Sequence, residues 1–313
     1  MLVQRKAQKF LQKEVNKMKK FVCTLLAGVM MALAFTGCTA TETPAPEPTD
    51  NVSADTTMTG QIYPITRESG SGTRSAFAEL FEIVDADGND AITETAESTS
   101  STSVMMTTVA GNESSIGYVS LGSLSDEVKA LKIDGADCTV ENVKSGDYKI
   151  SRPFNICYID GQLSEQAEDF KSFILSQEGQ AVIEEEGYIP METTEKYKSS
   201  GVSGKITLAG STSVAPVMDK LKDAYQKLNA DVTIEIQESG SSAGIQSATE
   251  GAVDIGMSSR DLTEEESATL TTEQIALDGI AVIVNMNNTI DGATSETIKS
   301  IYLAETTDWS DVK

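Results

Sequence analysis

The sequence predicts an α/β protein with two domains. Its 313 residues are enough for two hydrophobic cores. Four apolar runs that read as strands each end in a loop rich in Ser, Thr and Gly, and helical periodicity follows three of these loops. Because loops of this kind occur in both halves of the chain, we expect them to form one shared site.

The first loop follows residues 62–66, which read as a short strand, and precedes a helical pattern over 75–81. Its sequence is Arg67-Glu68-Ser69-Gly70-Ser71-Gly72-Thr73-Arg74. A strand-to-helix turn of this type directs backbone N–H groups and the positive end of a helix dipole at one point, and its glycines let an anion come close. Taken alone, it could equally be a flexible loop without a ligand.

Three similar loops occur in the second half of the chain. One lies between a strand expected at 204–209 and an amphipathic helix at 214–228, and another between a strand at 232–236 and a helix starting near Ile245. The third closes a further strand. Their sequences are Gly210-Ser211-Thr212-Ser213, Gly240-Ser241-Ser242-Ala243-Gly244 and Asp254-Ile255-Gly256-Met257-Ser258-Ser259-Arg260. Together with the first loop, they predict a site for one small oxyanion.

The apolar pattern predicts the remaining elements. Helices are expected at residues 103–110, 164–175, 177–186 and 295–302, the last with a start resembling a capping box. Strands are expected at residues 116–119, 128–133 and 274–285, and the last is apolar enough to be a buried or crossing strand. Asp87-Gly88-Asn89-Asp90 lacks the full calcium-loop pattern, so we interpret it as a solvated turn.

The composition argues against several classes of function. The chain has a formal net charge of −24 and no histidine. Residues before Cys38 include seven Lys or Arg and one Asp or Glu, so the remainder carries a net charge of −30. Such an acidic surface repels nucleic acid. A hydrolase or phosphatase would need a base or a metal cluster, so we expect no enzyme, no metal and no other cofactor.

The N-terminal segment is interpreted as an export signal. The apolar run 21–35 is too short to span a membrane and ends at Phe35-Thr36-Gly37-Cys38, which resembles a lipoprotein cleavage site. Cys38 is the expected lipidated residue, and an uncleaved anchor helix is the alternative. Met18 is a second possible translation start, so residues 1–17 need not be translated. Residues 38–59 predict a disordered tether, with a reach of about 25 Å.

At the four loops the sequence resembles the phosphate-binding proteins of bacterial ABC phosphate importers, the PstS family. The resemblance covers residues from about Gly60 to Lys313. It implies a two-lobed type II periplasmic-binding-protein fold with a hinge, an inter-lobe cleft and a crossing strand at 152–158. It also implies a lipoprotein at the outer face of the cytoplasmic membrane that captures inorganic phosphate and delivers it to a membrane permease.

The segments stand in an order that differs from the usual order in that family. Residues 204–309, which normally start the mature protein, come second here, and residues 61–190 come first. The chain therefore resembles a circular permutant whose former ends are joined through 191–203. The two lobes are expected at residues 60–150 with 285–313 and at residues 151–284. A truncated tandem repeat that pairs by domain swapping is the alternative.

The resemblance assigns the residues that would hold phosphate. Arg67 would be the ionic partner, able to pair with two oxygens, while hydroxyl and N–H groups would satisfy the other oxygens. The expected binding residues are Arg67, Ser71, Gly72 and Thr73 from one lobe, and Thr212, Ser213, Ser241 and Ser259 from the other. Arg74 and Arg260 are expected to form solvated or structural ion pairs.

Anion selectivity and the role of the fold stay open at this point. Some members of the family have an aspartate at the position of Ser259, which accepts the phosphate proton and so rejects sulfate. A serine leaves sulfate as an alternative, with Glu68 as another candidate acceptor. A surface adhesin or an anion sensor could also use this fold. Cys138 and Cys157 are expected as buried free thiols, with a disulfide as the alternative.

Overall fold

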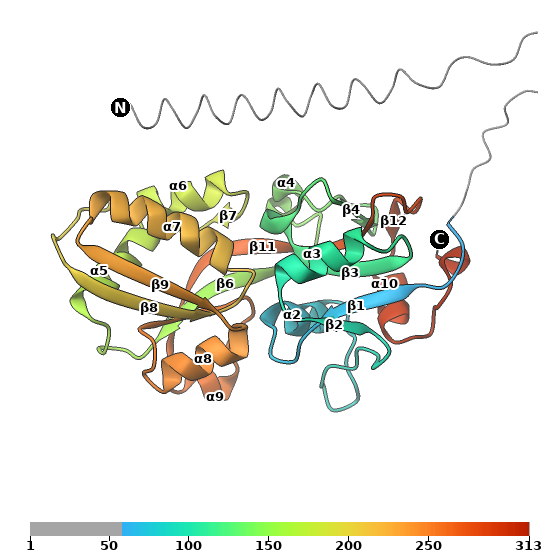
Figure 1. Ribbon diagram of the computed structural model, residues 1–313, viewed down its shortest axis with the longest axis horizontal. Coiled ribbons are helices and arrows are strands. Elements are labelled where there is room, and N and C mark those ends of the chain that lie inside the picture. The colour runs from blue at the N-terminus through green and yellow to red at the C-terminus, as the bar shows by residue number, and fades with distance from the viewer. Residues whose placement is uncertain (1–57, 313) are drawn as a thin grey trace, which may run out of the picture. The chain divides into compact units, whose positions relative to one another are not determined.

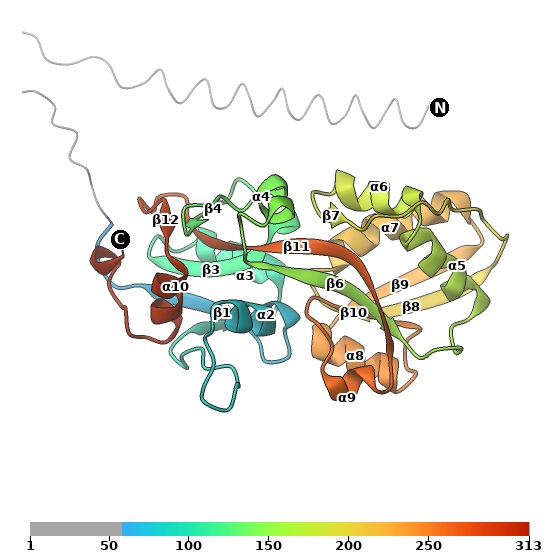
Figure 2. The same cartoon turned by 180° about the vertical axis from the view of Figure 1, so that it is seen from behind.

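Two long strands, β6 (Ser151–Tyr158) and β11 (Thr271–Asn285), connect the two lobes of this protein (Figures 1 and 2). The computed structural model describes residues 58–312. One sheet continues through both lobes in the order β2-β1-β3-β11-β6-β10-β8-β9, and β4 and β7 also pair with β11. The two crossing strands expected from the sequence and the two-lobed α/β fold are therefore confirmed.

The first lobe holds the N-terminal and C-terminal parts of the described chain. Its parallel strands β1 and β3 pair with each other, and β3 pairs antiparallel with the end of β11. Its elements are β1 (Tyr63–Arg67), α2 (Gly72–Leu80), β2 (Glu97–Thr99), α3 (Thr102–Ala110), β3 (Ser115–Ser120), the 3-10 helix η1 (Leu121–Ser123), β4 (Val128–Ala130), β5 (Lys132–Ile133), α4 (Val140–Ser145), β12 (Gly292–Ala293), α10 (Ser295–Tyr302) and the 3-10 helix η2 (Trp309–Asp311).

The second lobe is built from the middle of the chain. Strand β8 lies between two parallel neighbours, β9 and β10, and β10 pairs antiparallel with β6. Its elements are α5 (Glu165–Ile174), α6 (Gln177–Glu185), β7 (Ile189–Pro190), β8 (Gly204–Gly210), α7 (Ala215–Leu228), β9 (Val232–Glu238), α8 (Ser241–Thr249), β10 (Ile255–Ser258) and α9 (Glu264–Ser267).

Each lobe has its own hydrophobic core, and the two cores divide within β11. Ile275 and Ala276 belong to the core of the second lobe, whereas Ile280 to Val284 belong to that of the first. In the first core the ring of Phe77 stacks on that of Tyr118 at a centroid distance of 3.9 Å. The boundary between the lobes therefore lies near Gly279, before the boundary expected at residue 284.

Two expected element bounds and one expected helix cap differ from the structure. Helix α8 begins at Ser241 and not near Ile245, because Gly244 lets its first turn pack against β8, where a Cβ would lie 2.4 Å from the Ala209 carbonyl oxygen. The strand expected at 128–133 is split, since β4 pairs with β11 and β5 pairs with β12. Helix α10 has no capping box, because its cap is Thr294, which accepts from Thr297 N–H.

The segment 191–203, which joins the two parts of the chain, packs closely on the helices of the second lobe. Tyr197 lies edge-on to Phe173 at 5.1 Å and donates a hydrogen bond to Asp169. Tyr225 also donates to Asp169, at 2.8 Å, and the Ser200 hydroxyl is a third donor. Burial acts to raise the pKa of Asp169, but these hydrogen bonds outweigh it and the pKa is lowered.

The first and last described segments lie side by side in the first lobe. The Gly60 N–H donates to Asp308 Oδ1 at 3.1 Å, and the Trp309 N–H donates to the Gly60 carbonyl at 2.9 Å. Trp309 is fully buried in the first core and donates from its indole to the Ser114 carbonyl. The adjacency of these segments is the geometry that a circular permutation requires.

The remaining structural expectations concern thiols, membrane spans and metals. Cys138 and Cys157 are both buried with free thiols. Within residues 58–312, no helix has both the length and the apolar character needed to cross a bilayer. The same residues contain no group of His, Cys, Asp and Glu that could hold a metal ion. Cys38, the signal region and most of the tether lie outside the described residues.

A chain reopened at Gly201, with residue 312 joined to residue 58 through a short Gly/Ser linker, should keep the fold. The cut falls in an exposed loop, and the new linker bridges segments that already pair. Circular dichroism and thermal unfolding should match those of the parent chain within a few degrees. A chain reopened at Gly279, inside the crossing strand, should not fold. Loss of folding on reopening at Gly201 would contradict the adjacency seen here.

Tyr225→Phe should lower the free energy of unfolding by about 1–3 kcal/mol at pH 7, because a hydrogen bond to a buried carboxylate is lost. A lowered carboxylate pKa stabilises the fold above the unfolded-state pKa, and this stability is lost as the pH falls through the folded-state pKa. The difference from the parent should therefore shrink in urea unfolding at pH 3. Tyr148→Phe is the control, because Tyr148 donates to the Ile280 carbonyl, a neutral acceptor.

Candidate functional site

The site forms where the carboxyl ends of parallel strands from both lobes meet. In the first lobe Arg67, at the end of β1, pairs in register with Thr99, at the end of β2. In the second lobe Gly210, at the end of β8, is in register with Glu238 of β9 and with Met257 of β10. Ligands of open α/β sheets bind at such edges, since the loops that follow the strands gather there.

Four helices begin at this edge. They are α2 and α3 from the first lobe and α7 and α8 from the second. Ser71 and Ser101 cap α2 and α3 through their side chains, whereas α7 and α8 have no side-chain cap. The first N–H groups of a helix have no partner within the helix, so these starts supply donors and positive dipole ends to the cleft.

Arg67 lies at the centre of the contact between the lobes. Its side chain is only 2% exposed. Its Nη2 donates to Thr212 Oγ1 of the second lobe at 3.0 Å, and its Nη1 donates to Thr102 Oγ1 at 3.4 Å. Thr73 and Ser213 share a further bond across the cleft, with 2.9 Å between their hydroxyl oxygens. The arrangement brings together Arg67, Thr73, Thr212 and Ser213, as the sequence predicted.

Ser259 and Ser241 form an adjoining cluster of hydroxyls within the second lobe. Their hydroxyl oxygens are 3.3 Å apart, and the Ser259 N–H donates to Ser241 Oγ at 3.1 Å. Ser211 donates to Ser259 Oγ at 2.9 Å. All three residues are buried. Because hydroxyl groups both donate and accept, this cluster can bind a protonated or an unprotonated oxyanion oxygen.

Gly72 brings the first lobe directly against that serine cluster. A Cβ at position 72 would lie 2.3 Å from Ser241 Oγ and 2.8 Å from Ser259 Oγ, so a larger residue could not occupy this place. The neighbouring Gly70 carbonyl accepts a backbone bond from Ser242 of the second lobe at 3.1 Å. Ser71 is buried nearby, but its hydroxyl caps α2 by accepting from Arg74 N–H.

Glu68 balances the charge of Arg67. Its two carboxylate oxygens accept from Arg67 Nε and Nη2, each at 2.8 Å. The carboxylate is partly exposed, with 29% of its side chain accessible. The sequence suggested Glu68 as a proton acceptor for a ligand, and the structure places it on the guanidinium itself. The pair has no net charge, so the helix starts and hydroxyls supply the remaining attraction for an anion.

Arg74 and Arg260 form ion pairs at the edge of the site. Arg74 pairs with Asp90 and donates to the Arg67 carbonyl at 2.9 Å. Arg260 pairs through two bonds of 2.8 Å with Glu266, and it holds the pKa of that carboxyl below its usual range. Both arginines therefore have carboxylate partners, as the sequence indicated.

Tyr118 on β3 bonds the backbone of Arg67. Its hydroxyl accepts from the Arg67 N–H at 3.2 Å and lies 2.8 Å from Thr66 Oγ1. Burial raises the pKa of Tyr118 to about 12, so the hydroxyl stays neutral and can serve both as donor and as acceptor.

Two residues of the site were missed by sequence reasoning. Thr102, at the start of α3, lies within 3.4 Å of Arg67, Thr212 and Ser213. Ser211 lies in one of the predicted loops and donates to Ser259, a contact that the loop composition alone does not indicate. Ser101 and Thr102 follow strand β2 and start helix α3, and this strand-to-helix position resembles that of the predicted loops. Strand β2 has only three residues, so the sequence pattern did not reveal it as a strand.

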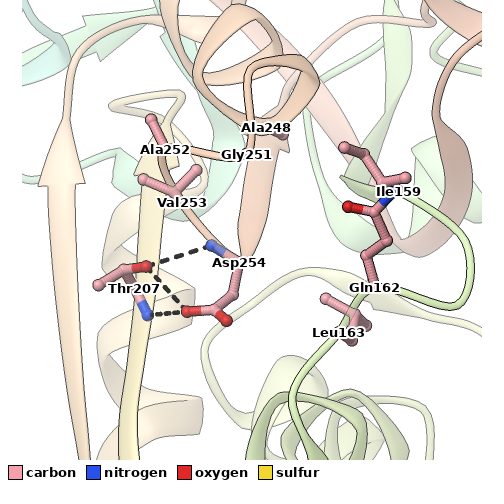
Figure 3. A pocket seen from close by; sticks show the side chains of 9 residues that line it. All are labelled: Ile159, Gln162, Leu163, Thr207, Ala248, Gly251, Ala252, Val253 and Asp254. Carbon is pink, nitrogen blue, oxygen red and sulfur yellow. Dashed lines mark hydrogen bonds between the residues drawn. The ribbon is translucent and has the colours of Figure 1, made fainter.

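A separate pocket of about 270 Å³ in the second lobe is lined by none of the residues expected to bind the anion. Two of its polar residues bond each other, because Asp254 Oδ2 accepts from the N–H and the hydroxyl of Thr207, each at 2.8 Å (Figure 3). Its lining residues include one carboxylate and no Lys or Arg. A pocket with this lining is not suited to an anion.

Comparison with known proteins places the chain in a family. A family model described as the PBP superfamily domain matches residues 50–178 and 195–313. Phosphate-binding protein PstS 2 of Streptococcus agalactiae serotype V is 50% identical over 258 residues, which cover 81% of this chain and 88% of that protein. A crystal structure of a phosphate ABC transporter phosphate-binding protein from Streptococcus pneumoniae TIGR4 matches with a TM-score of 0.66 and 44% identity, covering 81% of this chain and 100% of that chain.

The alignments also bear on the order of the segments. The match to PstS 2 extends over most of both proteins, so the two chains share one segment order and are not permuted relative to each other. Phosphate-binding protein PstS of Staphylococcus saprophyticus instead matches over 117 residues, 35% of this chain and 37% of that protein, at 32% identity. By its family model, its identity to PstS 2 and its two-lobed fold, the chain belongs to the PstS family of the PBP superfamily.

Proposed function

We propose that this protein captures inorganic phosphate outside the cytoplasm and delivers it to an ABC importer in the membrane. The cluster of Arg67, Thr73, Thr212 and Ser213 carries the proposal, because groups from both lobes meet there around one buried guanidinium. The relatives named phosphate-binding proteins support the same ligand. An arriving phosphate would exchange these hydroxyl contacts for contacts with its own oxygens.

Neutral donors suit this ligand in an acidic protein. The chain carries a formal net charge of −24, which repels an approaching anion. In the cleft, fixed hydroxyls and the starts of four helices replace the water around phosphate without adding net charge. Oriented dipoles of this kind act over short distances, so binding depends on closure of the lobes rather than on long-range attraction.

The binding residues proposed for phosphate are those expected from the sequence, extended by two. Arg67 would supply the ionic contact, and the Gly72 and Thr73 N–H groups at the start of α2 would supply backbone donors. The proposed set is Arg67, Ser71, Gly72, Thr73, Thr102, Ser211, Thr212, Ser213, Ser241 and Ser259. Lipid attachment at Cys38, which lies outside the described residues, would hold the protein at the membrane beside its permease.

Arg67→Lys should weaken phosphate binding by about 10-fold to 100-fold in isothermal titration calorimetry. A lysine keeps the charge but cannot donate in a planar fork to Glu68, Thr102 and Thr212 at once. Arg74→Lys is the matched control, because it changes an arginine of the same turn that pairs with Asp90, and its affinity should stay within about threefold of the parent. Equal losses in both variants would contradict a direct role for Arg67.

Ser259→Asp should widen the preference for phosphate over sulfate. At neutral pH hydrogen phosphate keeps a P–OH group that can donate a hydrogen bond to a buried carboxylate, whereas sulfate has no O–H group and would be repelled. We expect the parent to bind phosphate more tightly than sulfate, and the variant to lose at least about tenfold more affinity for sulfate than for phosphate. Competition titrations with phosphate, sulfate and arsenate measure both. Tighter binding of sulfate than of phosphate by the parent would overturn the proposed ligand.

A further inference from the structure

A buried ion pair lies at the hinge, next to the anion site. Arg152 on β6 and Asp278 on β11 are in register, and their side chains are 2% and 0% exposed. Arg152 Nε and Nη2 donate to Asp278 Oδ2 at 3.3 and 3.2 Å. Burying two charges is costly, and an ion pair often stabilises a fold no more than apolar residues of similar size would. Stability alone therefore does not account for this pair.

The pair connects both lobes to the loop that carries Ser259. On one side, Ser120 at the end of β3 donates to Asp278 Oδ1 at 2.8 Å. On the other side, Arg152 Nη1 donates to the Ser259 carbonyl at 3.2 Å. The path runs from Ser120 in the first lobe, through both crossing strands, to a residue of the proposed site in the second lobe.

Asp278 stands where the strand pairing changes from one lobe to the other. Strand β11 pairs with β6 as far as Gly279 and with β3 from Ile280 onward. A change in the angle between the lobes must bend the sheet near this point, because the crossing strands connect the lobes here. The contacts of Asp278 with Ser120 and Arg152 are therefore placed to change with that angle.

We propose that Arg152 is a positioning residue for anion binding. It holds the Ser259 carbonyl, and through Asp278 and Ser120 it ties the orientation of that loop to the closed arrangement of the lobes. Arg152 does not contact the anion in this role. It acts through Ser259, whose N–H bonds Ser241 and whose hydroxyl accepts from Ser211. This role rests on the proposed phosphate function.

Two variants distinguish an effect of Arg152 on the position of the Ser259 loop from an effect on the stability of the fold. Arg152→Lys keeps the charge opposite Asp278 but cannot donate to Asp278 and to the Ser259 carbonyl together. The double variant R152Q/D278N removes both charges and leaves amides that can bond each other, which avoids an unpaired buried charge. Both should unfold thermally within a few degrees of the parent. Tyr225→Phe, remote from the loop, is the control for a loss of stability alone.

Hydrogen–deuterium exchange of the phosphate-free proteins measures how firmly the loop that carries Ser259 is held. Backbone amides over residues 255–262 should exchange at least about threefold faster in both Arg152 variants than in the parent, and they should be unchanged in Tyr225→Phe. Phosphate affinity should fall by about tenfold or more in the Arg152 variants, the loss typical of one charge-assisted hydrogen bond.

Different outcomes of these experiments would contradict the positioning role and the proposed function. Unchanged exchange over 255–262, or a double variant that binds phosphate within twofold of the parent, would overturn the positioning role. Absence of phosphate binding by the parent would instead overturn the proposed function, while the exchange data would still decide whether Arg152 holds the loop.

Discussion

The buried charge of Arg67 is the constraint on which the arrangement of the two lobes depends. An isolated guanidinium away from water is unfavourable, so each of its donors needs an acceptor. Glu68 and Thr102 provide acceptors from its own lobe, and Thr212 provides one from the other lobe. Separation of the lobes would remove the Thr212 contact and let water reach the Arg67 side chain. Closure of the lobes therefore helps to compensate the charge of Arg67. An oxyanion that bonds Arg67 would shift the equilibrium between open and closed lobes toward the closed form.

The fold was largely predictable because its signals are local. Strands that end in Ser/Gly loops are read from short stretches of sequence, and the crossing strand β11 was visible from its apolar run. The start of α8 was misplaced because Gly244 was read as part of a loop, whereas it allows the helix to pack on β8. Its meaning depends on a neighbour distant in sequence, which no local pattern shows.

The site was predictable only in part, for the same reason. Arg67, Thr73, Thr212, Ser213, Ser241 and Ser259 lie in loops with a clear composition, and the structure brings them together. Thr102 carries a weaker signal, a Ser/Thr-rich stretch after a strand of only three residues, and Arg152 lies within a strand and carries none. Thr102 reaches the cluster because β2 pairs with β1, and Arg152 reaches the Ser259 carbonyl because β6 runs beside β10. Contacts of this kind follow from sheet order, which local sequence does not specify.

The sheet order would keep the same site if the segments along the chain were connected in a different order. The interactions that form the site are made between strand ends, and they do not require a particular connection between β7 and β8. Here the connection is the segment 191–203, held by Tyr197 and Ser200 on Asp169, while Gly60 and Trp309 lie together at the opposite junction. If the chain were instead continuous between the Gly60 and Trp309 segments and open within 191–203, β6 and β11 would still connect the two lobes. Arg67 and Thr212 would therefore still face each other. The crossing strands, and not the chain ends, therefore determine how the lobes close.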